Sequence, residues 1–161
     1  MNNLVIGNIL SKSLGATFKG VFSFEEWRSI PVQTGPGAFV FNTEPSSHKF
    51  GHWIAIYVQQ NGKAIFFDSF ARSPAELGFE GFLKKHSISW KYNNVLLQDP
   101  LTLVCGQHVI VFLITVATKG KTAWIKLFSS DLLCNDKLVF HIINHTFNTR
   151  CSFYPVSDFI M

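Results

Sequence analysis

The stretch "QDPLTLVCGQHVIVFLI", from Gln98 to Ile114, decides how the rest of the chain is interpreted. A cysteine and a glycine stand directly before a long apolar run, which predicts a buried helix over residues 105–118. Cys105 is therefore either a small core residue or a nucleophile at the start of a helix. At that position the helix dipole favours a thiolate over a thiol.

Upstream of this stretch, the sequence predicts a β-hairpin. The segments "HWIAIYV" (52–58) and "KAIFFDSF" (63–70) both favour strands, and the dipeptide Asn61-Gly62 between them is a typical turn signal. His52 begins the first strand, and Asp68 stands at the end of the second. Because hairpin strands run antiparallel, these two residues are expected at the same edge of the sheet.

The remaining segments complete an α+β pattern. Residues 4–14 predict a helix that stops at Gly15, and Ser23 with Glu26 form a capping-box pattern that opens a short helix. Further elements are expected in the following segments: strands in "GAFVFNT" (37–43) and "KYNNVLLQ" (91–98), a helix in "SPAELGFEGFLKKHS" (73–87), a loop in "KGKTAWIK" (119–126), and one or two late helices from about residue 130.

These elements predict a single domain over residues 1–161. Its α+β fold has one small mixed or antiparallel sheet packed on a central buried helix that carries the cysteine. The chain has 161 residues, 47% of them hydrophobic and 15% aromatic, which is enough apolar surface to exclude a disordered chain.

Composition also limits the cellular compartments and the partners that are expected for the protein. The longest apolar run, residues 109–117, is about half of what a bilayer requires, so no membrane contact is expected. No signal peptide is recognisable at the N-terminus. Three widely spaced cysteines do not form a disulfide framework, which favours a reducing intracellular compartment. The net charge of +4 is compatible with nucleic-acid contact.

Four residues have the chemistry that acyl transfer by a thiol requires. Cys105 supplies the nucleophile and His52 the general base, and Asp68 orients the imidazole. Gln98, at the end of the predicted strand, offers a side-chain amide to an oxyanion, and the backbone amide of Cys105 provides a second donor.

This pattern resembles the adenovirus-type cysteine proteases, the adenain family, whose clan includes the SUMO-specific proteases. The resemblance is carried by "GHWIAIYV", "FFDSF" and a glutamine seven residues before Cys-Gly, in that order, and by "ILSKSLGATFKGVFSFEEW" near the N-terminus. It assigns the catalytic roles to His52, Asp68, Gln98 and Cys105. It implies a site that is papain-like in geometry, although the order His, Asp, Gln, Cys differs from that of papain.

The resemblance also implies substrates and setting. It implies an endopeptidase that cleaves precursor proteins of a virus or virus-like element during virion maturation, acts as a monomer, and is located in the virion and the host cell nucleus. Trp53 and Gly106 are the substrate-binding residues that it suggests. Neither a cofactor nor a metal is expected. DNA is a candidate activator, whereas a disulfide-linked peptide activator is not expected, because "KKHSISWKYNNVLL" (84–97) lacks cysteine.

Several alternatives remain beside this interpretation. The same four residues would serve a deconjugase of a ubiquitin-like modifier, and a binding domain would keep Cys105 as a core residue. A zinc site is a further possibility, with Cys105 and His108 joined by His141 and His145. Lys119, Lys121 and Lys126 form the densest basic run, in which Trp124 would stack on a base and the lysines would contact phosphates.

Overall fold

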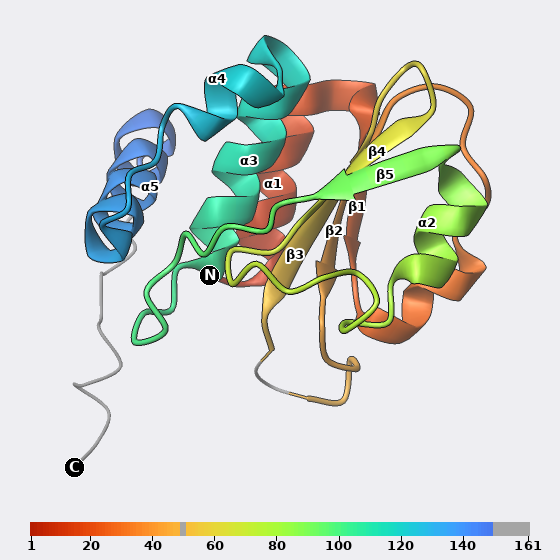
Figure 1. Cartoon of the computed structure of the whole chain (residues 1–161), viewed down its shortest axis with the longest axis horizontal. Helices are drawn as coiled ribbons and strands as arrows, with labels where there is room; N and C mark the ends of the chain where they lie inside the picture. Colours follow the sequence, from red (N-terminus) through yellow and green to blue (C-terminus); the bar gives the residue numbers. More distant parts are fainter. Residues whose placement is uncertain (49–50, 150–161) are drawn as a thin grey trace.

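A mixed sheet of five strands forms the centre of the protein, in the order β1-β2-β3-β4-β5 (Figure 1). The computed structural model describes residues 1–48 and 51–149. β2, β3 and β4 are antiparallel to one another, and the edge strands β1 and β5 run parallel to their neighbours. The strands are β1 (Phe18–Phe22), β2 (Gly37–Asn42), β3 (Trp53–Val58), β4 (Lys63–Phe67) and β5 (Ser89–Tyr92).

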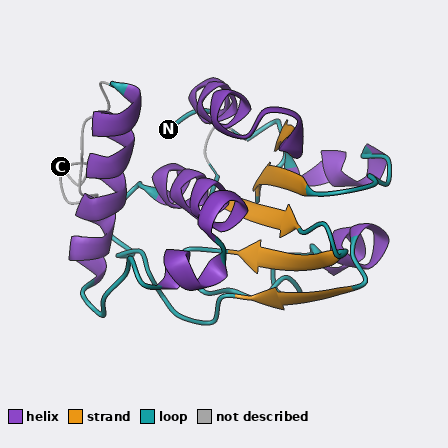
Figure 2. Cartoon of the chain, turned by 90° about the horizontal axis from the view of Figure 1, so that it is seen from above, coloured by secondary structure: helices purple, strands orange, loops and turns teal. Residues whose placement is uncertain are grey.

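Helices cover both faces of this sheet, as the view from above shows (Figure 2). Helix α3 packs against β3, α1, α4 and α5 on one face, and α2 lies on the other. The helices are α1 (Asn3–Leu14), α2 (Glu80–His86), α3 (Cys105–Lys119), α4 (Lys121–Ile125) and α5 (Leu132–Phe147), with 3-10 helices η1 (Gly15–Thr17) and η2 (Phe24–Ser29). No helix in the described part of the chain is long and apolar enough to cross a membrane.

The alternation of side chains along β2 shows why two layers of helices are needed. Ala38 and Val40 point into the core beneath α1, α3 and α5, whereas Phe39 and Phe41 point into the core beneath α2 and η2. All four side chains are fully buried, so both faces of the strand are apolar. A strand that is apolar on both sides requires a cover on both faces.

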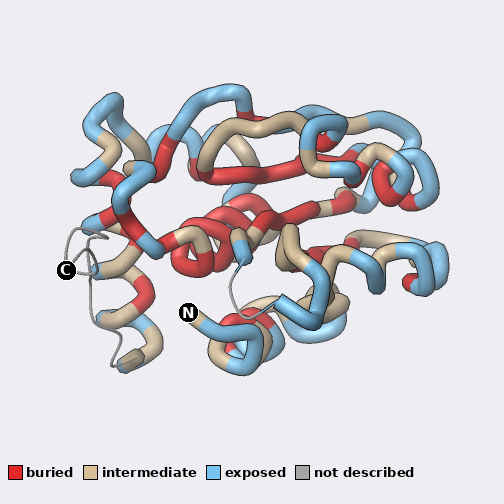
Figure 3. Tube along the Cα trace, turned by 90° about the horizontal axis from the view of Figure 1, so that it is seen from below, coloured by how far each residue is buried: buried red, intermediate tan, exposed pale blue. Residues whose placement is uncertain are grey.

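Among the helices of the described residues, α3 has the largest share of buried residues, and its course through the core is visible as a mostly buried segment (Figure 3). Most of its residues are buried, on every side of the helix, because neighbours surround it. The helix ends where Gly120 takes a positive φ of 83° and its N–H donates to the carbonyl of Val116. Cys105 begins this rigid element and is thereby held in a fixed position.

The structure confirms the elements that the sequence marks with the strongest signals. α1 ends at Gly15, β3 and β4 form the hairpin around Asn61-Gly62, and α3 covers the apolar run after Gln98. Ser23 and Glu26 form the predicted capping box, although the helix that follows is a 3-10 helix. The central helix on a small mixed sheet is also confirmed, with the addition of a second helical layer.

One strand differs from the predicted bounds, and another was not predicted. The last strand, β5, begins at Ser89 and ends at Tyr92, so "KYNNVLLQ" is mostly loop, because Asn93 turns away to bond the backbone of Asp68. β1 was missed altogether. It carries Gly20 at a φ of 137° and an irregular register, and a glycine inside a strand weakens its sequence signal.

Two helices also differ from the prediction. α2 begins only at Glu80, because Ser73 and Glu76 close a separate turn and Gly78 adopts a φ of 75° before the helix. α4 occupies part of the lysine-rich run that was expected to be a loop, because the side chain of Trp124 is buried against α3.

Candidate active site

The hairpin brings His52 and Asp68 together at one edge of the sheet. His52 directly precedes β3 and Asp68 directly follows β4, and the two strands are antiparallel. The Nε2 atom of His52 lies 2.5 Å from Oδ1 of Asp68. Because a carboxylate only accepts hydrogen bonds, Nε2 carries the hydrogen and Nδ1 remains for a second partner.

Asp68 is fully buried, yet its surroundings keep it ionised. Burial by itself would raise the pKa of this carboxyl, but the hydrogen bond and the charge of His52 outweigh that effect and lower the pKa. Arg72 adds to the lowering, because its Nε lies 2.8 Å from Oδ2. The backbone N–H groups of Phe70 and Arg72 also donate to the carboxylate, at 3.1 and 3.2 Å.

The turn after Asp68 places a ring against the imidazole of His52. Phe70 stacks on His52 with 4.7 Å between ring centroids and 29° between ring planes. Ala71, next in the chain, has a positive φ of 62°, a conformation that costs a residue with a Cβ roughly 1 kcal/mol or more. This strained turn allows Phe70 to pack on His52 while Arg72 returns to Asp68.

Cys105 is a further partner of the His52 imidazole. Burial of the thiol disfavours its ionisation, but a hydrogen bond to His52, the charge of His52 and the backbone N–H of Trp53 outweigh it and lower the pKa of Cys105. Burial likewise opposes protonation of His52, but its hydrogen bonds to Asp68 and Cys105 outweigh burial and raise its pKa. The two shifts favour a thiolate–imidazolium pair.

The sulfur opens onto a cleft of about 650 Å³. The walls of this cleft come from the start of α1, the end of β1 and the connection between β2 and β3, and Cys105 lies among the lining residues. Phe22, Trp53 and Leu103 provide apolar lining, whereas Glu26 and Glu44 provide carboxylates. A cleft of this size can accept several residues of an extended peptide beside the thiol.

Trp53 and Gly106 both lie at the contact between this cleft and α1. The indole Nε1 of Trp53 donates to the carbonyl of Met1 at 3.2 Å, and Trp53 lines the cleft. A Cβ added at Gly106 would stand 3.0 Å from Cβ of Met1 and 3.5 Å from Cδ1 of Trp53. Gly106 thus permits close packing within the protein, and its role toward a substrate stays a prediction.

Gln98 lies close to the triad in the fold but has other partners. Its side chain is buried, with Oε1 accepting from the hydroxyl of Ser69 at 2.7 Å and Nε2 donating to the carbonyl of Thr102 at 3.0 Å. Among the hydrogen bonds of the described residues, none joins Gln98 to Cys105, His52 or Asp68. Its role at an oxyanion therefore stays a prediction.

The lysine-rich run corrects one expectation. Lys119 and Lys126 are exposed and Lys121 is half-buried, so all three remain candidates for phosphate contact. Trp124 is only 1% exposed and packs against Phe67 and Phe112. Stacking of Trp124 on a nucleic-acid base was therefore a wrong prediction.

The zinc alternative finds no support. The Nε2 of His108 contacts Asp136 at 2.7 Å, and Cys105 interacts electrostatically with His52. In residues 1–48 and 51–149, no group of three or more His, Cys, Asp or Glu side chains is arranged to hold a metal ion. Cys151 lies outside the described residues.

The sequence did not predict three residues that hold His52 and Asp68 in place: Phe70, Arg72 and Asn93. The side chain of Asn93 accepts from the N–H of Asp68 at 2.9 Å and donates to its carbonyl at 2.7 Å, which fixes the backbone at the end of β4. The spacing of Arg72 from Asp68 was the one available signal, because an arginine four residues after a carboxylate can return to it across a turn.

Solved structures with a similar fold come from two sources. The ASFV pS273R protease matches with a TM-score of 0.58 and 19% identity, over 88% of this chain and 66% of that one. ChlaDub1 of Chlamydia trachomatis matches with a TM-score of 0.50 and 13% identity, over 68% and 58%. The Chlamydia trachomatis effector Cdu1, solved bound to ubiquitin, matches with a TM-score of 0.50 and 14% identity, over 92% and 78%.

This chain has the fold of the adenain-like and SUMO-specific cysteine protease clan. The resemblance stated from its sequence motifs is therefore confirmed at the level of the fold. The sequence itself matches no protein-family model and no curated protein. The chain spans 58% of ChlaDub1 and 66% of the ASFV protease.

The shifted pKa values predict how the thiol reacts with iodoacetamide. In a Cys134→Ser/Cys151→Ser background, Cys105 is the only thiol left of the three. Because its pKa is lowered, alkylation should stay fast from pH 8 down through neutral pH, and decline only on further acidification. With His52→Ala the decline should begin near pH 8.5, the ordinary range of a thiol. The second-order rate constant measured from pH 5 to 10 tests this.

Two results would contradict this assignment. Identical profiles for the His52→Ala variant and its parent would show that the imidazole does not ionise the sulfur. Failure of Cys105 to react at any pH would show that the thiol is a closed core residue. The Lys12→Ala variant is a suitable control, because this lysine lies at the far end of α1 from the cleft.

Proposed function

We propose that this protein is a cysteine endopeptidase with an acyl-enzyme mechanism. The observation that supports it best is the pairing of Asp68 with His52, whose imidazole interacts with Cys105 in the wall of a cleft. A core cysteine would not need a buried carboxylate and an imidazole aligned behind it, since burying such polar groups is costly. The adenain-like fold, shared with an ASFV protease, supports the same conclusion.

The residues suggest the following course of reaction. His52 takes the proton of Cys105, and the thiolate attacks a peptide carbonyl carbon. The oxyanion that forms is held by the Nε2 of Gln98 and the backbone N–H of Cys105. His52 then gives its proton to the leaving amine, and the carbonyl remains on the sulfur as a thioester. A water molecule, deprotonated by His52, attacks the thioester and releases the acid and the thiol.

The substrate that we propose is a precursor protein of a virus or virus-like element, cleaved during virion maturation. This part of the proposal rests on the resemblance to the adenain family, and with it go the virion and the host cell nucleus as the place of action. Activation by DNA would involve Lys119, Lys121 and Lys126, which lie at the end of α3 and around α4, away from the residues that line the cleft.

A deconjugase of a ubiquitin-like modifier is the second candidate. Cdu1, which shares the fold, was solved bound to ubiquitin. In this chain, large apolar side chains are exposed on the segment before α3, with Leu101 at 62% and Leu103 at 59%, and Leu103 also lines the cleft. An apolar rim beside the thiol would suit a folded protein substrate as well as an extended peptide.

One set of incubations separates the candidates. We expect the wild-type protein to cleave a peptide library at bonds that follow glycine, and Cys105→Ala and His52→Ala to leave it intact. A ubiquitin-like modifier with a C-terminal vinyl sulfone is run in parallel, and labelling of Cys105 by it would favour the deconjugase. Equal turnover of both substrates by the wild type and the two variants would remove the proposal.

A further inference from the structure

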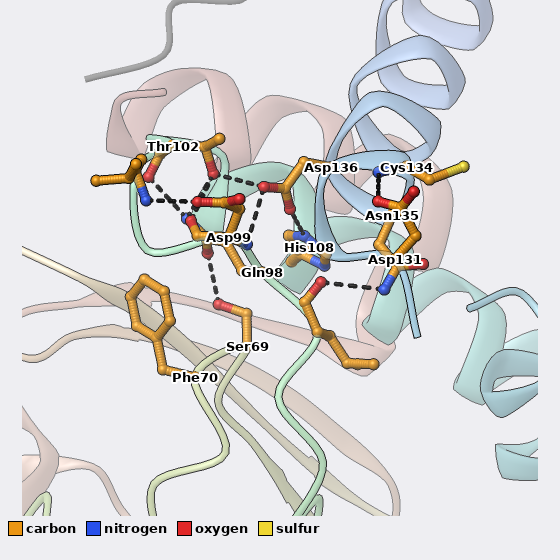
Figure 4. Close-up of polar contacts among 12 residues, drawn as sticks. Ser69, Phe70, Gln98, Asp99, Thr102, His108, Asp131, Cys134, Asn135 and Asp136 are labelled. Carbon is orange, nitrogen blue, oxygen red and sulfur yellow. Dashed lines mark hydrogen bonds and ion pairs between the residues drawn. The ribbon is translucent and has the colours of Figure 1, made fainter. Parts of the chain in front are cut away.

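A second buried polar cluster centres on Asp136 of α5 and is linked through Gln98 to Ser69, the residue after Asp68 (Figure 4). Three donors converge on its carboxylate. The Nε2 of His108 lies 2.7 Å from Oδ1, and the hydroxyl of Thr102 lies 2.6 Å from Oδ2. The backbone N–H of Asp99 donates to Oδ2 at 3.0 Å.

This cluster is closed to water. His108 and Asp136 are 0% exposed, and Thr102 is 3% exposed. Burial lowers the pKa of His108 even though its bond to Asp136 acts in the other direction, so the ring is neutral and donates from Nε2. A buried carboxylate is costly unless donors surround it, and apolar side chains would stabilise the same space at least as well. The cluster therefore calls for an explanation besides stability.

The cluster connects directly to the side chain of Gln98. Thr102, held by Asp136, accepts from the Nε2 of Gln98 at its carbonyl, at 3.0 Å. At the other end of the amide, Ser69 donates to Oε1 at 2.7 Å. Ser69 directly follows Asp68, and its carbonyl accepts from the backbone N–H groups of Leu97 and Gln98. The amide plane of Gln98 is thus fixed at both ends.

The geometry leaves one N–H of this amide for a ligand. An amide nitrogen has two hydrogens, and the carbonyl of Thr102 takes one of them. The remaining contact of Nε2, to the hydroxyl of Thr102, is long at 3.4 Å, and that hydroxyl gives its own hydrogen at 2.6 Å to Asp136. A fixed amide with an available donor is what stabilisation of an oxyanion requires.

Helix α3 links the position of the Cys105 sulfur to the position of the Gln98 amide. His108 lies one turn after Cys105 on this helix, so the element that presents the nucleophile also holds Asp136. Asp136 in turn binds Asp99 and Thr102, which belong to the loop between Gln98 and α3. The distance between nucleophile and oxyanion donor therefore depends on this one carboxylate.

We propose that Asp136 is a positioning residue, which acts with His108 and Thr102 to hold the amide of Gln98 for the oxyanion. This inference rests on the proposed endopeptidase function. Asp136 does not touch the substrate. It fixes the loop that carries Gln98. A misplacement of this loop by about 1 Å would reduce the stabilisation of the transition state and leave the thiol reactive.

The test compares Asp136→Asn with Asp131→Asn. Both variants remove one negative charge from α5 or its N-cap, but Asp131 is exposed and asparagine also caps a helix. For a peptide that the wild type cleaves, Asp136→Asn should lower kcat about 10- to 100-fold and leave KM within about twofold, because a lost oxyanion donor costs roughly 100- to 1000-fold. Asp131→Asn should match the wild type.

A second readout separates positioning from general damage. Alkylation of Cys105 by iodoacetamide forms no oxyanion, so its rate and pH profile should stay within about twofold of wild type in Asp136→Asn. Thr102→Val keeps the buried carboxylate and should lower kcat in the same direction. In a Gln98→Ala background, Asp136→Asn should have little further effect on kcat. Unchanged kcat, or equal losses in hydrolysis and alkylation, would overturn the proposal.

A third readout does not depend on proteolysis. If the wild type cleaves no substrate although Cys105 is alkylated, the endopeptidase function fails, and the side-chain amide signals of Gln98 in ¹⁵N NMR still decide the positioning role. They should be slow to exchange in the wild type and in Asp131→Asn, and shifted and fast to exchange in Asp136→Asn. Identical Gln98 signals in all three proteins would overturn the inference.

Discussion

Replacement of Cys105 by alanine should abolish peptide cleavage, with a loss of turnover on the order of 10⁶-fold for a residue of a nucleophile–base pair. Without the sulfur no acyl-enzyme forms, and His52 has no proton to accept. A fluorogenic form of the best peptide from the library measures the loss. The fold should persist, because alanine is smaller than cysteine and lies at the start of α3 beside an open cleft.

The cysteine at position 134 provides the matched control. Cys134 is exposed on α5, and Cys134→Ala should keep full turnover. The double variant Cys105→Ala/His52→Ala should be no slower than Cys105→Ala alone, because the two residues act as one unit. Turnover by Cys105→Ala within tenfold of the wild type would show that another group attacks the peptide.

Replacement of Asp68 by asparagine should lower kcat about 10⁴-fold, because it changes which nitrogen of His52 carries the hydrogen. The carboxylate accepts from Nε2, which leaves Nδ1 free to accept the proton of Cys105. An amide at position 68 can turn its NH₂ group toward the ring, so that Nε2 accepts and the hydrogen moves to Nδ1. The imidazole then presents a hydrogen to the sulfur and can no longer act as its base.

The same variant should also change the pH dependence of the thiol. Asp68 contributes to the raised pKa of His52, and that imidazolium helps to lower the pKa of Cys105. Asp68→Asn should therefore slow alkylation at neutral pH and restore it at alkaline pH. Glu80→Gln is the control, because Glu80 is a surface carboxylate paired with Lys84. A kcat within tenfold of wild type, with a native thermal transition, would contradict the role of Asp68.

Local patterns made the central part of the fold predictable. Asn61-Gly62 between two apolar strands identifies the hairpin, and the run after Cys105 identifies α3, because turn chemistry and continuous apolarity are short-range signals. The edge strands were harder to predict from the sequence. β1 and β5 each have one neighbour and run parallel to it, and their positions depend on contacts such as that between Asn93 and Asp68.

The reactive centre was predictable only in part, for a similar reason. The order of His52, Asp68 and Cys105, together with the antiparallel hairpin, places three groups near one another. Phe70 and Asp136 carry no such signal, and the signal of Arg72 is limited to its spacing from Asp68. Phe70 and Arg72 gain their places from the strained turn at Ala71, and Asp136 gains its place from the packing of α5 against α3. Long-range packing of this kind is not visible in residue spacing.

The division of the site among segments also orders its assembly during translation. His52 and Asp68 belong to one hairpin and can pair as soon as β4 has left the ribosome, since hairpin contacts are local. Cys105 arrives with α3, and Asp136 is synthesised last, within α5. A nascent chain therefore holds the base before it holds the sulfur, and it orders the loop of Gln98 last. Under the proposed function, the donors that stabilise the oxyanion are therefore the last part of the site to form.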